Sequence, residues 1–281
     1  MKKTGGTSGI GGFGPVSQVR PVAKGALRVG TSGWQYADWR TVLYPRGLPQ
    51  SRWLERYSER FDTVESNAAF YRLPPYELFR RWSELTPPGF VMAVKASRYL
   101  THIRRLSAPE EPVGRLMRAA FGLGDKLGPV LLQLPPTLRA DAGLLARCLN
   151  CFPSGVRVAV EPRHASWWTE EIRDLLAARG AALCWADRRG RPVTPLWRTA
   201  DWVYLRCHEG AARPWPAYGE AALHAWASRV GEVTADGCDA YVYFNNDPSA
   251  AAVHNALRFA DIASAGRPAS FSASRELERG R

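Results

Sequence analysis

Ionisable side chains stand at or just after the ends of short apolar segments along this chain. Five of them are the candidate catalytic residues: Glu65, Lys95, Glu161, Asp187 and His208. Carboxylates that crowd into one pocket acquire different pKa values, as a pair that donates and accepts protons requires. We therefore expect Glu161, together with Glu65 or Asp187, to transfer protons in an active site.

Lys95 is one of only five lysines in a chain with 33 arginines. At such a site a lysine binds an anion, forms an ion pair with Glu65 or Glu161, or acts as a nucleophile if it is desolvated. Of these three roles we expect the ion pair. His208 is either a catalytic group or a hydrogen-bonded structural histidine.

A second group of polar and aromatic residues is predicted to bind the substrate. Arg206 ends an apolar segment near the position where many barrels bind phosphate. Aromatic rings offer stacking faces to a sugar or a base, with packing over a barrel rim as the alternative. The predicted substrate-binding residues are Ser32, Trp34, Asn67, Tyr71, Gln133, Arg163, Arg206, Asn245 and Asn246.

A divalent metal ion is compatible with the sequence but weakly indicated. His102, His164 and His208, together with the carboxylates, are suitable ligand types. No close-spaced metal motif such as H-E-x-x-H occurs. The sequence therefore leaves the metal and any other cofactor unassigned.

From residue 26 onwards, short apolar runs alternate with longer amphipathic stretches, which is typical of βα units around a parallel sheet. The predicted strands are 27–30, 63–65, 90–95, 130–134, 156–161, 182–187, 202–206 and 240–245. The predicted helices lie near 51–60, 76–85, 110–124, 141–151, 169–178, 218–232 and 250–263. Asp247 and Pro248 should cap and open the last helix, and only the connection 188–200 looks irregular.

This pattern predicts an α/β fold, a single (β/α)8 TIM-type barrel of parallel strands over residues 26–264. Residues 1–25 are predicted to be a disordered tail, because they are rich in Gly, Ser and Thr and lack periodicity. Residues 265–281 are predicted to be a frayed, polar tail.

Side chains on a strand alternate in direction, so each polar strand end can be assigned to a face. Ala159 and Glu161 should point into the barrel, and we place Asp187 inside as well, with Leu183 and Trp185. The carboxyl ends of barrel strands meet at one mouth, where barrel enzymes carry their catalytic groups. We expect a polar, anion-compatible pocket there. The alternative is a hydrogen-bonded structural network.

The formal net charge is +12, but residues 1–24 contribute +4 and residues 265–281 contribute +2. Charge concentrated in the tails favours solubility over a nucleic-acid-binding surface on the barrel.

No stretch approaches the ~20 apolar residues that a membrane span needs, and five irregularly spaced cysteines fit a reducing cytosol. We therefore expect a cytoplasmic protein without membrane contact, and we leave its oligomeric state open.

Distinctive motifs run through most of the chain: Gly30-Thr31-Ser32-Gly33-Trp34, Thr63-Val64-Glu65-Ser66-Asn67, Gln133-Leu134-Pro135-Pro136, Glu161-Pro162-Arg163-His164 and Tyr241-Val242-Tyr243-Phe244-Asn245-Asn246-Asp247. In this order they resemble the domain of unknown function 72 family, also called YecE-like, over roughly residues 26–260. The resemblance implies a TIM barrel and no established reaction. Two departures are visible: Pro162 stands where an aromatic residue is usual, and Glu209 interrupts the usual His-Gly pair.

These observations favour a hydrolase or lyase that acts on a phosphate- or sugar-containing substrate, with nucleic acid as one candidate. A retaining glycosidase is disfavoured, because it needs two carboxylates about 5 Å apart. In barrel glycosidases they follow strands four and seven, where this chain carries Gln133 and Arg206. The alternative function is a non-catalytic module that binds a small anion, a nucleic acid or a partner protein.

Overall fold

The computed structural model describes residues 25–235 and 237–265. The two predicted tails, 1–25 and 265–281, lie outside the described residues except for their inner ends.

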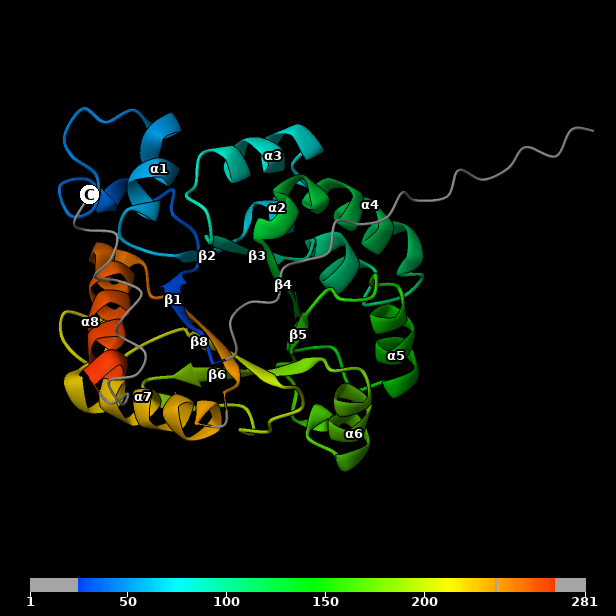
Figure 1. The fold of residues 1–281 in the computed structure, drawn as a ribbon. Helices are drawn as coiled ribbons and strands as arrows, with labels where there is room; N and C mark the ends of the chain where they lie inside the picture. Colours follow the sequence, from blue (N-terminus) through cyan, green and yellow to red (C-terminus); the bar gives the residue numbers. More distant parts are fainter. Residues whose placement is uncertain (1–24, 236, 266–281) are drawn as a thin grey trace, which may run out of the picture.

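Eight parallel strands form the barrel (Figure 1). They are β1 (Leu27–Thr31), β2 (Thr63–Ser66), β3 (Val91–Lys95), β4 (Leu127–Gln133), β5 (Val158–Glu161), β6 (Ala182–Arg188), β8 (Trp202–Cys207) and β9 (Asp239–Phe244). Neighbours follow the order β1-β9-β8-β6-β5-β4-β3-β2, and a parallel bridge between Ser32 and Glu65 joins the two ends of this row. The predicted (β/α)8 barrel is thereby confirmed, with small shifts at the strand ends.

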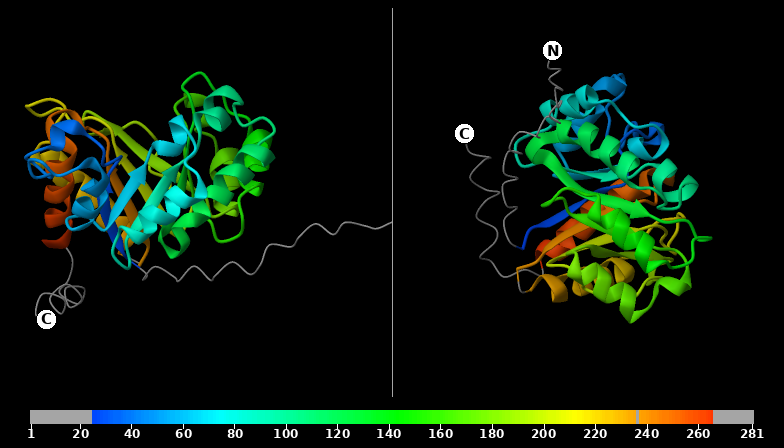
Figure 2. Two further views of the ribbon diagram at one scale, coloured as in Figure 1. Left: turned by 90° about the horizontal axis from the view of Figure 1, so that it is seen from above. Right: turned by 90° about the vertical axis from the view of Figure 1, so that its right-hand side faces the viewer.

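Helices surround the strands, as two further views make clear (Figure 2). They are α1 (Trp53–Ser58), α3 (Tyr76–Glu84), α4 (Glu110–Ala120), α5 (Ala142–Asn150), α6 (Glu170–Ala178), α7 (Glu220–Thr234) and α8 (Ala251–Ala265). All seven predicted helices are present. None of the helices in the described part of the chain combines the length and apolar character that crossing a bilayer requires.

Shorter elements complete the connections. Short 3-10 segments are η1 (Ala37–Trp39), η2 (Gln50–Arg52), η4 (Phe121–Lys126), η5 (Ala165–Trp167) and η6 (Pro248–Ala250). The irregular connection after β6 contains β7 (Arg191–Pro192), which pairs antiparallel with β6. The elements that were not predicted include α2 (Ala68–Tyr71) and the π-helical turn η3 (Tyr99–Ile103). They follow β2 and β3, so they lie on the side of the barrel where those strands end.

The barrel interior is filled by a second apolar cluster, separate from the core between strands and helices. It contains Val91, Ala93, Leu131, Ala159, Ala182, Cys184, Trp202, Tyr204, Tyr241 and Tyr243. The predicted inward face of β5 is therefore correct, whereas that of β6 is wrong. Leu183 and Trp185 belong to the outer core. Both faces of β6 are apolar, so no alternation of polar and apolar residues shows which side chains of this strand point into the barrel.

The barrel closes where β1 approaches β2, and Gly30 allows that approach. A Cβ atom built on Gly30 would lie 2.2 Å from the carbonyl oxygen of Thr63 and 3.0 Å from the Tyr57 hydroxyl. Backbone atoms cannot move aside as a flexible side chain can. Only glycine fits here without separating the two strands whose ends carry Ser32 and Glu65.

We predict that Gly30→Ala lowers the free energy of unfolding by about 1–3 kcal/mol, the usual range for overpacking a filled interior. Urea unfolding followed by circular dichroism measures this. The matched control is Gly231→Ala in α7, where an added Cβ meets no atom within 4 Å. That change should be neutral or stabilising by up to ~1 kcal/mol, because alanine favours helix. Equal effects of the two substitutions would contradict the close approach of β1 and β2.

Candidate functional site

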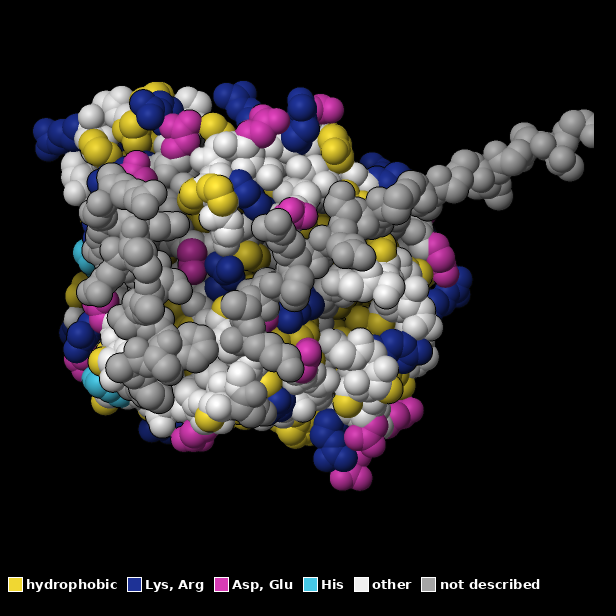
Figure 3. Space-filling model, in the orientation of Figure 1, with side chains coloured by type: hydrophobic (Ala, Val, Ile, Leu, Met, Phe, Trp, Pro, Cys, Tyr) yellow, Lys and Arg dark blue, Asp and Glu magenta, His cyan; other side chains and the backbone are white. Residues whose placement is uncertain are grey.

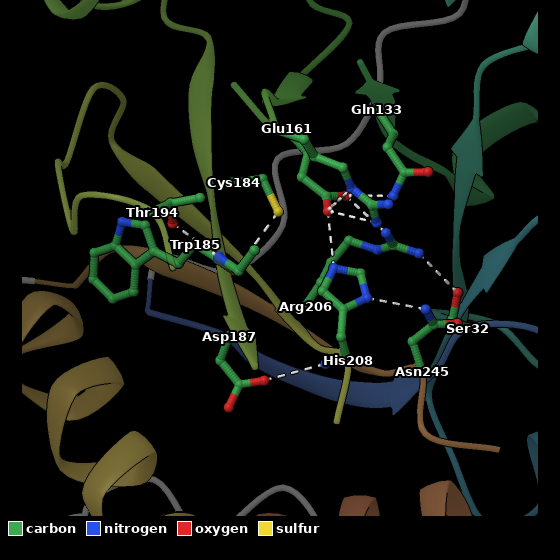
Figure 4. A network of polar contacts seen from close by, with 12 residues as sticks. Ser32, Gln133, Glu161, Cys184, Trp185, Asp187, Thr194, Arg206, His208 and Asn245 are labelled. Carbon is green, nitrogen blue, oxygen red and sulfur yellow. Dashed lines mark hydrogen bonds and ion pairs between the residues drawn. The ribbon is translucent and has the colours of Figure 1, made fainter. Parts of the chain in front are cut away.

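Arg206, near the end of β8, is the centre of a polar cluster in the barrel mouth (Figure 4). Its buried guanidinium donates four hydrogen bonds. Nε and Nη2 bind the two oxygens of Glu65 at 2.9 and 2.8 Å, and Nη1 binds Glu161 Oε2 at 2.7 Å. Nη2 also donates to Ser32 Oγ at 3.2 Å. One side chain therefore links the ends of β1, β2, β5 and β8.

Glu65, on β2, is completely buried and fully hydrogen-bonded. Besides the two bonds from Arg206, it accepts the Tyr204 hydroxyl at 2.7 Å and the Ser32 hydroxyl. Burial by itself would raise the pKa of Glu65, but the Arg206 guanidinium holds that pKa below its usual value. Glu65 is thus a charged acceptor at neutral pH.

Glu161, at the end of β5, is paired as completely. Gln133 donates to Oε2 at 2.9 Å, and Arg163 donates to Oε1 at 3.3 Å. Burial opposes ionisation here too, but Arg206 and His208 hold the pKa of Glu161 well below its usual value. A carboxylate held in this state is poorly suited to exchange protons near neutral pH.

His208, two residues beyond Arg206, lies between Glu161 and Asn245. Its Nε2 is 2.8 Å from Glu161 Oε1, and Asn245 Nδ2 is 3.1 Å from its Nδ1. Because the amide donates to Nδ1, the ring proton sits on Nε2 and is donated to Glu161. Burial lowers the pKa of His208 in spite of Glu161. The imidazole is therefore neutral, and its tautomer is set by two neighbours.

Lys95, at the end of β3, differs from the rest of this cluster. It is buried, yet no hydrogen bond or ion pair joins it to any residue that the structure describes. Its Nζ lies over the ring of Phe70, 4.1 Å from the ring centre. Burial, with Arg206 as the next contribution, lowers the pKa of Lys95 to about 8. The expected ion pair with Glu65 or Glu161 is not formed, because Arg206 already occupies the carboxylate oxygens.

Asp187 does not join the cluster in the mouth. It accepts hydrogen bonds from the Tyr218 hydroxyl, from Trp226 Nε1 at 3.0 Å and from the backbone nitrogen of His208 at 3.2 Å. Burial raises the pKa of Asp187 to about 7. In Figure 4 it lies apart from the group around Arg206. The predicted inward placement is wrong, since Asp187 shares the outer face of β6 and contacts α7.

The predicted substrate-binding residues divide into two sets. Around Arg206 the structure gathers Ser32, Asn67, Gln133, Arg163 and Asn245. Asn67 Nδ2 donates to Ser32 Oγ at 3.0 Å, whereas its buried Oδ1 has no hydrogen-bond partner among the described residues. Lys95 Nζ and Asn67 Oδ1 are therefore among the groups of the mouth that have no hydrogen-bond partner in the described chain.

The remaining three predicted binding residues lie elsewhere. Trp34 is buried in the core, where it packs edge-on against Trp82 with ring centres 5.2 Å apart. Asn246 is buried between loops and donates to Pro216 O and Asn255 Oδ1. Tyr71 lies on the rim and is 83% exposed. Trp34 and Asn246 therefore pack within the protein and do not join the cluster around Arg206.

Asp247 is an ionisable residue of the mouth that sequence reasoning assigned to a helix cap. It does precede η6, but its side chain forms no capping hydrogen bond. One carboxyl oxygen, Oδ1, is buried without a hydrogen-bond partner in the described chain. Burial raises the pKa of Asp247 to about 7, and the nearby charges of Asp38 and Glu65 add to this shift. The sequence signal for this role was only its position directly after the last strand.

The predicted metal ligands do not assemble. Among residues 25–235 and 237–265, no group of three or more His, Cys, Asp or Glu side chains is arranged to hold a metal ion. His102 packs against Phe70, and His164 binds Ser166. The unpaired groups of the mouth are instead an amine, an amide oxygen and a carboxyl group.

Residues 28–277 match the family described as Protein of unknown function DUF72. The chain belongs to this family. It is 24% identical over 269 residues to the UPF0759 protein YunF of Bacillus subtilis, a match that covers 84% of this chain and 94% of that protein.

Two solved DUF72 structures have the same fold. The protein TM1631 of Thermotoga maritima is 28% identical, with a TM-score of 0.74 over 85% of this chain and 99% of the other. The protein EF0366 of Enterococcus faecalis is 19% identical, with a TM-score of 0.72 over 86% and 97% of the two chains. These names state no activity, so function must be argued from the site.

We predict that Arg206→Met lowers the free energy of unfolding at pH 7 by about 3–5 kcal/mol, because it leaves two buried carboxylates without their partner. The matched control is Arg258→Met, which breaks an exposed pair with Glu220 and should leave the unfolding midpoint nearly unchanged. Urea unfolding of both variants measures the difference. An equally small effect of the two substitutions would contradict the central role of Arg206.

The deficit of Arg206→Met should also shrink as the pH falls from 7 to 4. In the natural protein, the lowered pKa values of Glu65 and Glu161 stabilise the fold above their unfolded value of about 4.3, and this contribution is lost at lower pH. Without Arg206, burial raises both pKa values, so the variant gains stability when the carboxylates become protonated. A deficit that is constant with pH would contradict this account.

Proposed function

We propose that the barrel mouth is the active site of a hydrolase or lyase that acts on a small phosphate- or sugar-containing anion. The observation that carries the proposal is Lys95, a buried amine without a direct partner beside a network in which the other charges are paired. An amine that is mostly removed from water and has no anionic partner gains interaction energy when an anion binds beside it. A phosphate or carboxylate group would supply the missing partner.

The charges around Lys95 support an anionic ligand. Glu65 and Glu161 carry two negative charges, which Arg206 and Arg163 balance through direct ion pairs. Lys95 then adds a positive charge that no carboxylate contacts.

We propose a small molecule rather than a nucleic acid as the ligand of the mouth. On the face shown in Figure 3, which is the side where the barrel strands begin and lies opposite the mouth, Lys and Arg side chains lie among Asp and Glu side chains and do not gather into one basic patch. Binding a nucleic acid along its backbone relies on a continuous row of cations. The proposed substrate therefore carries its negative charge as one group that enters the mouth.

Proton transfer in this proposal belongs to Lys95 and Asp247. Their pKa values move towards neutrality from opposite directions, to about 8 and about 7. Such a pair is suited to general acid and base roles at physiological pH. Glu65 and Glu161, proposed from the sequence for the same task, act here by fixing Arg206 and His208.

A non-catalytic anion-binding module is the second candidate. It is favoured by the completeness of the network around Arg206, which leaves few groups free to react. In that case the mouth would still bind an anion through Lys95, but the ligand would leave unchanged.

We predict that Lys95→Met weakens sulfate binding at pH 7 by at least about tenfold, because a hydrogen bond to a charged group is worth about 1.5–3 kcal/mol. Isothermal titration calorimetry measures the affinity. The control Arg173→Met removes an exposed cation on α6 and should leave sulfate binding unchanged. In the natural protein the affinity should fall as the pH rises through about 8, where Lys95 loses its proton while sulfate stays dianionic. Binding that is independent of Lys95 or of pH would refute the anion site.

Metabolite profiling separates the enzyme from the binding module. We expect the natural protein, incubated with a cell metabolite extract, to deplete at least one phosphate- or sugar-containing compound, and we expect Lys95→Met and Asp247→Asn not to do so. Mass spectrometry compares the extracts before and after incubation. If sulfate binding depends on Lys95 but no compound is consumed, the protein is the binding module and not the enzyme.

A further inference from the structure

A cavity of about 280 Å³ lies on the rim beside the mouth. We call it the rim pocket, and its main lining residues are Phe70, Tyr71, Arg98, Tyr99, Ile103 and Arg115. They come from α2, from η3 with the residue before it, and from the start of α4. Because α2 follows β2 and η3 follows β3, the pocket lies at the carboxyl ends of two neighbouring strands. That is the side of the barrel where Lys95 ends β3.

Phe70 connects the rim pocket to the mouth. It lines the pocket, and Lys95 Nζ lies 4.1 Å from the centre of its ring. His102 packs edge-on against the same ring, with ring centres 5.2 Å apart. A ligand in the pocket is therefore one aromatic ring away from the unpaired amine. A single molecule of modest length can contact both places.

The pocket gathers apolar side chains that the described chain leaves exposed. Tyr71 is 83% exposed, Ile103 is 61% exposed and Tyr99 is 45% exposed. They are three of the nine large apolar residues that are exposed in the described residues, yet they line one cavity. Single exposed apolar residues need no explanation, whereas a group of them around a cavity is typical of a binding site.

The charges at the pocket are also favourable to an anionic molecule. Arg98 is exposed at its edge, and Arg115 lies 3.4 Å from Glu111 in an exposed pair that solvent weakens. Aromatic rings beside arginines provide stacking faces for a flat ring and attract negative charge nearby. The aliphatic side chain of Ile103 closes the apolar part of the surface.

We propose that the rim pocket is a second subsite, which holds an aromatic ring of a substrate whose anionic group is bound by Lys95. The inference rests on the proposed function, because it assumes that the mouth binds the anion. It narrows the substrate class to aryl-bearing anions, in which a planar ring is joined to the phosphate or carboxylate. The ring stacks among Phe70, Tyr71 and Tyr99, and the anionic group reaches past Phe70 to the amine.

Two small phosphates test the proposal in the full-length protein. Methyl phosphate and phenyl phosphate carry the same anionic group, and only the second has a ring. Stacking of one ring on aromatic side chains predicts that phenyl phosphate binds about tenfold more tightly.

The double variant Tyr99→Ser with Ile103→Ser should remove this preference and leave the affinity for methyl phosphate unchanged. Both side chains are exposed, so the variant keeps the fold. Val193→Ser, at an exposed residue outside the pocket, is the control and should change neither affinity.

The outcomes separate the two proposals. If both phosphates bind equally and in a Lys95-dependent manner, the rim pocket is no subsite, while the proposed function stands. A ring preference that survives the double variant also overturns the inference, because the ring then binds elsewhere. If neither phosphate binds, or if Lys95→Met leaves both affinities unchanged, both proposals fall. Loss of the preference in the double variant alone supports the subsite.

Discussion

A buried guanidinium held between two buried carboxylates is the interaction on which the rest of the mouth depends. Removing three charges from water costs several kcal/mol for each ion, so such a cluster is stable only when its pairing is nearly complete. Arg206 provides this pairing, because its planar fork binds both oxygens of Glu65 and still reaches Glu161. Since the partners lie on β2, β5 and β8, the cluster exists only when the barrel is closed.

Because this pairing is complete, Lys95 has no carboxylate partner. Every carboxylate oxygen that it could have contacted already accepts hydrogen bonds, and its Nζ lies instead over Phe70. The network thus fixes the floor of the mouth and leaves one amine available to a ligand. A fully hydrogen-bonded network with a single unpaired cation beside it is suited to position an anion. The groups around the cation need not reorganise when the anion binds.

Short rim elements decide what else a ligand can touch. The turns α2 and η3 follow directly from the strands that carry Glu65 and Lys95, so the rim pocket and the mouth share a common support. Barrel proteins vary function through such loops while the strands keep their geometry. Membership in the DUF72 family therefore accounts for the barrel, and the chemistry must be sought in these few side chains.

The sequence by itself determined the eight strands, their helices and most of the strand faces, because polarity alternating along a strand is a local pattern. Glu65, Glu161 and Arg206 were identified in this way, from polar ends of apolar runs. Only the tertiary structure decided the outward face of Asp187, since both faces of β6 are apolar. It also decided which charges pair. Arg206, and not Lys95, pairs with the carboxylates because in the closed barrel its side chain reaches from β8 to Glu65 on β2 and to Glu161 on β5. The local order of residues does not specify which of the two cations forms these ion pairs.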